Sequence, residues 1–117
     1  MRIHTKIWIE TDDGKLLLGE GRLEILKTIE RTGSLSAAAR ELGMSYRAVW
    51  GKVRTTEQRL GVKLVAGEAG GRRHGGAKLT ENGRIFVASF DNFDKKARAA
   101  VDKLGGRFLD DLSFSEE

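Results

Sequence analysis

Four large side chains that can hydrogen-bond or stack lie in one nine-residue stretch of the chain, 46–54: Tyr46, Arg47, Trp50 and Arg54. An arginine guanidinium group can donate two parallel hydrogen bonds to guanine O6 and N7, or it can bind a phosphate. We expect Arg47, in the first turn of its helix, to read a base, and Arg54 to meet a phosphate. Tyr46 either donates to a phosphate or packs under a neighbouring hairpin. Trp50 is either mostly core or has one edge near a nucleic acid.

Three serines stand where helices are expected to begin: Ser34, Ser36 and Ser45. A serine at a helix N-terminus accepts a hydrogen bond from the helix backbone and so caps it. The same helix start binds phosphate through its amides and hydroxyls. Capping and phosphate docking are compatible, so both interpretations stay open.

A second basic cluster lies in a glycine-rich stretch, residues 66–76, which holds five glycines. Its candidate contact residues are Arg72, Arg73, His74 and, just beyond it, Lys78. Glycines allow close approach of the backbone and arginines supply charge, as expected of a wing that lies along DNA. A nucleotide phosphate loop is the alternative, but no Lys-Ser/Thr pair follows the glycines at the required spacing.

The positive charge of the chain is concentrated in its middle third. Residues 40–78 carry nine basic against three acidic side chains, whereas residues 1–39 sum to zero and the formal net charge of the whole chain is +4. A localised basic surface suits a polyanionic partner, because each neutralised phosphate releases counterions. A solvated basic face with no partner is the alternative.

The elements that must position these residues follow from hydrophobic spacing and turn signals. Two short helices, 35–42 and 46–60, are separated by Gly43-Met44, and the small Ala38 and Ala39 allow them to cross closely. This is the pattern of a helix-turn-helix, whose second helix presents its N-terminal residues to the major groove. We expect the other elements to be a β-hairpin at 1–18 with strands at 3–10 and 15–18, a helix at 20–31, a hairpin at 62–79 (the wing) and a long helix at 80–104.

The long helix carries an apolar heptad seam. Its members step by four and three residues: Phe86, Phe90, Phe93, Ala97, Ala100 and Leu104. Such a seam predicts a homodimer joined through paired helices. The alternative is that the three phenylalanines fold back onto the domain's own core. Gly105-Gly106 should end this helix, leaving 105–117 as an acidic tail.

Composition excludes several classes of protein. The chain has no cysteine, no apolar run that could span a membrane and no apolar core of a secretion signal at its N-terminus, so we expect a cytoplasmic protein. His4 and His74 are isolated, so no metal or other cofactor is expected, and no catalytic motif indicates an enzyme. We expect one α+β, mainly α domain over 1–104.

The stretch that begins at Gly33 resembles the N-terminal domain of ModE-type molybdate-responsive regulators, which share the winged helix of LysR-type regulators. The resemblance is carried by GSLSAAA at 33–39, LGMSYRAVW at 42–50, the glycine-rich wing and LTENG at 79–83. It implies a bacterial transcriptional regulator that binds a pseudo-palindromic operator in double-stranded DNA, with Ser45, Tyr46, Arg47 and the wing arginines facing the DNA. It also implies a homodimer joined through the long helix and the N-terminal segment.

The sequence departs from the family pattern at its C-terminus. Full ModE-type proteins continue into paired small β-barrel domains that bind molybdate, and these 117 residues leave no segment for them. We therefore expect no molybdate ligand in this chain. A protein-interaction module and a small-anion sensor, both using the same scaffold, are the alternative functions.

Overall fold

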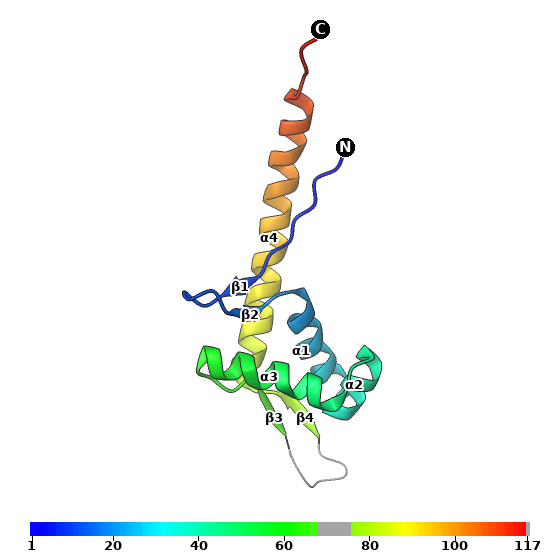
Figure 1. Cartoon of the computed structure of the whole chain (residues 1–117), viewed down its shortest axis with the longest axis vertical. Helices are drawn as coiled ribbons and strands as arrows, with labels where there is room; N and C mark the ends of the chain where they lie inside the picture. Colours follow the sequence, from blue (N-terminus) through cyan, green and yellow to red (C-terminus); the bar gives the residue numbers. More distant parts are fainter. Residues whose placement is uncertain (68–75, 117) are drawn as a thin grey trace.

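The computed structural model describes residues 1–67 and 76–116. Within these residues the fold consists of four helices and two small antiparallel sheets (Figure 1), so the expected α+β, mainly helical class is confirmed. In chain order the elements are β1 (Ile9–Glu10), β2 (Leu16–Leu18), α1 (Glu20–Thr32), α2 (Leu35–Leu42), α3 (Tyr46–Leu60), β3 (Val65–Gly67), β4 (Ala77–Leu79) and α4 (Glu81–Asp111). No helix in this part of the chain is both long and apolar enough to cross a membrane.

Apart from the C-terminal end of α4, the helix ends form where the sequence signals predict them. Three glycines end α1, α2 and α3 in the left-handed conformation, with φ values of 71°, 67° and 81°: Gly33, Gly43 and Gly61. Three hydroxyl side chains cap the next helices by accepting from a backbone amide three residues on: Ser34, Ser45 and Thr80. A glycine adopts positive φ without steric cost, and a hydroxyl satisfies a free amide of the first turn, so each signal acts locally.

The core lies where α1, α2 and α3 meet the wing. Ile29, Ala38, Val49 and Leu64 are fully buried there. Ala38 allows the close crossing of α2 and α3 that the sequence predicts. One continuous apolar cluster therefore fixes the helix pair and the base of the wing together.

The N-terminal hairpin is shorter than predicted. The strand expected over 3–10 is limited to Ile9–Glu10, and the returning strand to Leu16–Leu18. Residues before β1 run as an extended segment beside α4 (Figure 1). Ile3 packs its side chain onto the buried Gly105 of α4. Packing on a helix thus replaces strand pairing for this segment.

Helix α4 extends seven residues beyond the predicted stop at Leu104, since it ends at Asp111. Gly105 and Gly106 lie inside it, so the prediction that they end the helix was wrong. A helical glycine costs about 1 kcal/mol, which packing can offset. At Gly105 an added Cβ would lie 2.7 Å from Ile3 Cδ1, so the small residue makes room for the N-terminal segment. The acidic tail without regular structure begins only at Leu112.

Candidate nucleic-acid interface

One side of α3 is polar and exposed, whereas the opposite side is core. Val49, Val53 and Thr56 are buried. Tyr46 is 44% exposed, and Arg47 and Arg54 are exposed as well. The helical repeat therefore separates a packing face from a face that can contact a ligand.

Trp50 lies at the border of these two faces. It is half-buried and packs against the core, while the guanidinium carbon of Arg54 lies 5.6 Å from the centroid of its ring. This cation–π contact restricts the rotamers of Arg54 before any ligand binds. Trp50 is thus part of the packing and also supports an exposed cation.

The back of α3 is hydrogen-bonded to α1. The Arg22 guanidinium donates to the Lys52 carbonyl at 2.6 Å and to Thr56 Oγ1 at 2.8 Å. Partial burial and the nearby charge of Arg59 lower the pKa of Arg22 below its ordinary value. These hydrogen bonds hold α3 near its middle and leave its N-terminal turn exposed.

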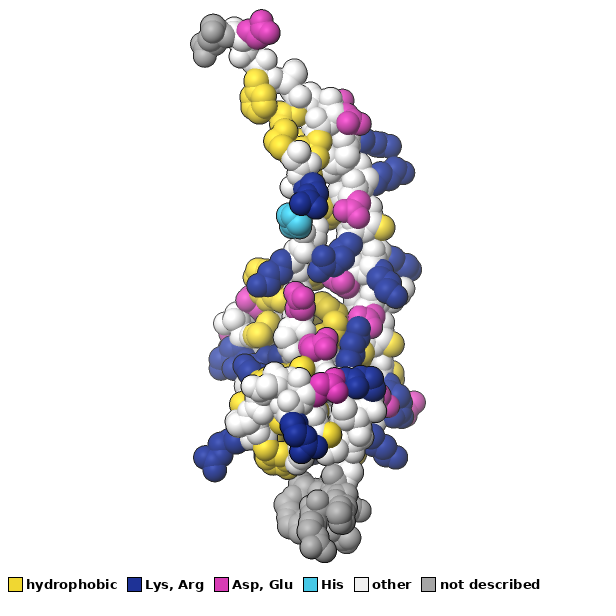
Figure 2. Space-filling model, turned by 90° about the vertical axis from the view of Figure 1, so that its right-hand side faces the viewer, with side chains coloured by type: hydrophobic (Ala, Val, Ile, Leu, Met, Phe, Trp, Pro, Cys, Tyr) yellow, Lys and Arg dark blue, Asp and Glu magenta, His cyan; other side chains and the backbone are white. Residues whose placement is uncertain are grey.

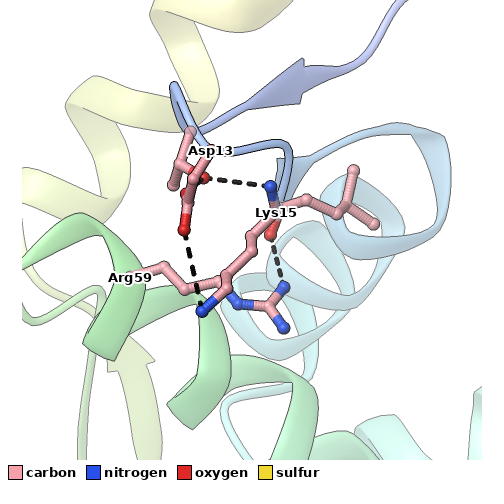
Figure 3. A network of polar contacts seen from close by, with 5 residues as sticks. Asp13, Lys15 and Arg59 are labelled. Atoms are coloured by element: carbon pink, nitrogen blue, oxygen red, sulfur yellow. Dashed lines mark hydrogen bonds and ion pairs between the residues drawn. The ribbon is translucent and has the colours of Figure 1, made fainter.

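The N-terminal hairpin holds α3 at a second point (Figure 3). Arg59 Nη1 donates to the Leu16 carbonyl at 2.8 Å. Thr56 Oγ1 donates to the Leu17 carbonyl at 3.2 Å. Lys15 and Asp13 pair at 3.8 Å in the adjoining turn. The hairpin therefore helps to fix the orientation of the helix that carries Arg47.

Ser34 and Ser45 act as caps in the structure. Ser34 Oγ accepts from Ala37 N at 3.1 Å, and Ser45 Oγ accepts from Ala48 N at 3.0 Å. Ser36 is exposed in the first turn of α2. Capping is established for two of the three serines, and their phosphate contacts stay a prediction.

The wing pairs Val65 with Leu79 and Gly67 with Ala77, and Lys78 is exposed on β4. Its predicted tip residues lie outside the described part of the chain: Arg72, Arg73 and His74. At the base of the wing, Thr80 Oγ1 donates to the Lys63 carbonyl at 2.7 Å. The two strands are thereby joined to each other and to the start of α4.

Two glutamates that sequence reasoning missed hold the wing to the helices. Glu57 on α3 is 6% exposed, and its Oε2 accepts from Leu64 N at 2.8 Å and from Val65 N at 3.1 Å. Glu30 on α1 is exposed, yet its Oε2 accepts from Leu79 N at 3.0 Å. Glu57 was detectable, because it stands four residues after the inward Val53 and so shares its face. Glu30 likewise stands four residues after the inward Leu26, so the same spacing signal was present on α1.

The predicted apolar seam of α4 divides in two. Phe90 is 4% exposed and belongs to the core, and Phe86 packs against the same cluster. The domain's own core thus takes up the side chain of Phe90, whereas the assignment of the half-buried Phe86 to a dimer interface stays a prediction. Phe93 and Leu104 are 55% and 64% exposed. Ala97 is half-buried and Ala100 is exposed, so the available seam runs from 93 to 104.

Side-chain types are distributed unevenly over the surface. In Figure 2, lysine and arginine side chains surround the lower body near the wing, and apolar side chains gather towards the far end of α4. The exposed apolar residues at that end include Leu104, Phe108 and Phe114. No group of three or more potential metal ligands occurs within residues 1–67 and 76–116.

Two crossed helices, an exposed first turn on the second and a β-hairpin fixed beside it define a winged helix-turn-helix. Residues 21–84 match the family model described as "Bacterial regulatory helix-turn-helix protein, lysR family". The chain belongs to this family. The predicted resemblance to LysR-type winged helices is thus confirmed.

Relatives of known name refine the comparison. The chain is 35% identical to the molybdenum transport protein ModE of Azotobacter vinelandii over 106 residues, which cover 91% of this chain and 39% of that protein. It is 32% identical to the DNA-binding transcriptional dual regulator ModE of Escherichia coli (strain K12), over 77% of this chain and 34% of the relative. The predicted similarity to ModE-type proteins is confirmed, and the chain spans little more than a third of their length.

Solved structures agree with the fold. The crystal structure of full-length CbnR complexed with its target DNA matches 71% of this chain and 27% of that chain, with a TM-score of 0.54 and 25% identity. The match shows that the helix pair and the wing are arranged here as in a LysR-type regulator.

Proposed function

We propose that this chain is a transcriptional regulator that binds double-stranded DNA, with the N-terminal turn of α3 in the major groove. One observation carries the proposal: Arg47 and Tyr46 are exposed in the first turn of a helix whose back is fixed to α1 and to the hairpin. Arg54 and Lys78 supply further cations. Affinity then comes largely from phosphates and decreases steeply with salt.

The proposed contact set keeps the predicted residues on both the helix pair and the wing. Arg47 reads a base, and the remaining side chains hold the protein to the DNA backbone.

A gel-shift titration with random duplex DNA at two salt concentrations tests the claim that the chain binds double-stranded DNA. Absence of binding at low salt would contradict the claim. If the chain binds, selection from a random pool of duplexes identifies the operator.

Replacing Arg47 with alanine should weaken binding to the selected operator by about 1–3 kcal/mol and relax the preference at one base position. The reason is the loss of a bidentate contact to a base edge. Fluorescence anisotropy on the operator and on single-base variants measures both effects. Arg107→Ala removes an equal charge from an exposed site near the end of α4 and should change little. Uniform weakening on all DNA sequences would assign Arg47 to a phosphate instead.

We also propose that the regulator acts as a homodimer through the exposed part of the seam, from Phe93 to Leu104. Two recognition helices would then enter major grooves roughly 34 Å apart on a pseudo-palindrome. The support is the exposure of Phe93 and Leu104 on a helix that extends beyond the body (Figure 1).

Leu104→Glu should shift the dimer to monomer and weaken self-association by about tenfold or more, because it would bury a charge in the interface. Sedimentation equilibrium over a range of concentrations measures this shift. Ala99→Glu introduces the same charge at an exposed position on the other side of α4 and should leave association unchanged. A wild-type chain that is monomeric at all concentrations would refute the dimer.

A further inference from the structure

The outer edge of the wing is hydrogen-bonded to the C-terminal end of α1. In the pairing of β3 with β4, Ala66 lies opposite Lys78. Alternate residues of a strand direct their amides to opposite sides. The amides of Ala77 and Leu79 point away from β3 and donate to the Gly33 carbonyl at 2.9 Å and to Glu30 Oε2 at 3.0 Å. Glu30 of α1 and Gly33, the C-cap residue of that helix, thus satisfy both free edge amides of β4.

Lys78 is the residue between these two held amides. Its side chain is exposed, and within the described strands of the wing it is the one lysine or arginine. Because both neighbours are fixed to α1, the backbone that carries Lys78 has a defined place relative to the helix pair. Of the two hydrogen bonds that fix this backbone, the one that Leu79 N donates to Glu30 Oε2 is accepted by a side chain, and the other is accepted by a backbone carbonyl.

Among residues 1–67 and 76–116, no lysine or arginine forms an ion pair with Glu30. Its charged neighbours on α1 have partners elsewhere: Lys27 pairs with Asp91 at 2.8 Å, and Arg31 pairs with Glu41. A carboxylate near a DNA-binding surface repels phosphate, so on charge alone its removal should tighten binding. If Glu30 instead holds β4 in place, loss of its hydrogen bond should weaken DNA binding.

We infer that Glu30 is a positioning residue, which holds strand β4 and Lys78 in place to contact the DNA backbone. This inference rests on the proposed DNA-binding function and assigns to α1 a part in setting the wing. Glu30 acts through Leu79 N and Lys78 and touches no nucleic acid itself.

Two substitutions separate the hydrogen bond from the charge. Glu30→Gln removes the charge and keeps an oxygen at the same reach, whereas Glu30→Asp keeps the charge and is one methylene shorter. We expect Glu30→Asp to weaken binding about threefold to tenfold, as for one lost hydrogen bond. Glu30→Gln should bind as well as wild type or slightly better. Glu24→Gln, at an exposed position on the same helix, is the control for charge removal.

Coupling to Lys78 provides a readout that a purely structural role would not change. In wild type, Lys78→Ala should lower the slope of log affinity against log salt by about 1. In the Glu30→Asp background the same substitution should have a much smaller effect, because the lysine is already displaced. Circular dichroism melting of each variant verifies that it is folded.

The outcomes separate this inference from the proposed function. If wild type does not bind DNA at low salt, the proposed function itself fails. If wild type binds and Glu30→Asp binds equally well, only the role of Glu30 is overturned. Equal weakening by Glu30→Gln and Glu30→Asp, or additive effects of Glu30→Asp and Lys78→Ala, would also overturn it.

Discussion

Gly83→Ala should destabilise the fold by about 3 kcal/mol or more, because no space exists for the added methyl group. A Cβ at Gly83 would lie 2.2 Å from the Leu64 carbonyl oxygen and 3.1 Å from its carbon. These are backbone atoms at the base of the wing, so neither can rotate away. The first turn of α4 would have to move from the wing. Urea denaturation followed by circular dichroism measures the loss.

Gly106→Ala is the matched control for this prediction. Gly106 also lies in α4, but an added Cβ would meet nothing within 4 Å. Alanine is a better helix former, so this substitution should stabilise the chain by about 0.5–1 kcal/mol. Equal behaviour of the two variants would contradict the close approach at Gly83.

Glu57→Ala should lower the free energy of unfolding by about 2–5 kcal/mol. Its carboxylate is buried and accepts from the amides of both Leu64 and Val65, which would lose their partner in a water-poor site. Each unsatisfied buried donor costs about 1–3 kcal/mol. Chemical denaturation measures the effect, and protection of the two amides from hydrogen exchange should decrease with it.

Two further variants test the Glu57→Ala prediction: Glu57→Gln is the conservative substitution, and Gln58→Ala is the control truncation at a neighbouring position. Both amides donate to the single oxygen Oε2, so glutamine can retain the two bonds and should cost less than alanine. Gln58 is the exposed neighbour on α3, and its truncation should stay within about 0.5 kcal/mol. A Glu57→Ala variant as stable as Gln58→Ala would show that the two hydrogen bonds contribute nothing.

The helix pair that carries the candidate site was predictable because its signals are local. Ser34, Gly43 and Ser45 act within one turn of their own positions, and the spacing of Val49 and Val53 identifies the buried face of α3. The exposure of Arg47 follows from the same spacing. Such features depend on backbone conformation and periodicity, which a short stretch of sequence contains.

Features that depend on residues far apart in the chain were predicted less well. Gly105-Gly106 reads as a helix end, but Ile3 packs on Gly105 and α4 continues. Phe90 fits a heptad seam, but α4 lies against the body and buries it. At Gly105 tertiary packing outweighed a local preference of about 1 kcal/mol, and at Phe90 the domain's own core took up a side chain that the heptad spacing assigns to a partner helix.

The sequence alone therefore determined the order of the helices, their caps and the exposed cations of α3. Tertiary structure decided how the wing is attached: Glu57 and Glu30 accept hydrogen bonds from wing residues seven to 49 positions away. Spacing from Val53 indicates that Glu57 faces inward, but no spacing in the sequence identifies the distant amide that a carboxylate binds. Only folding brings that amide within hydrogen-bonding distance, so only the structure reveals the contact.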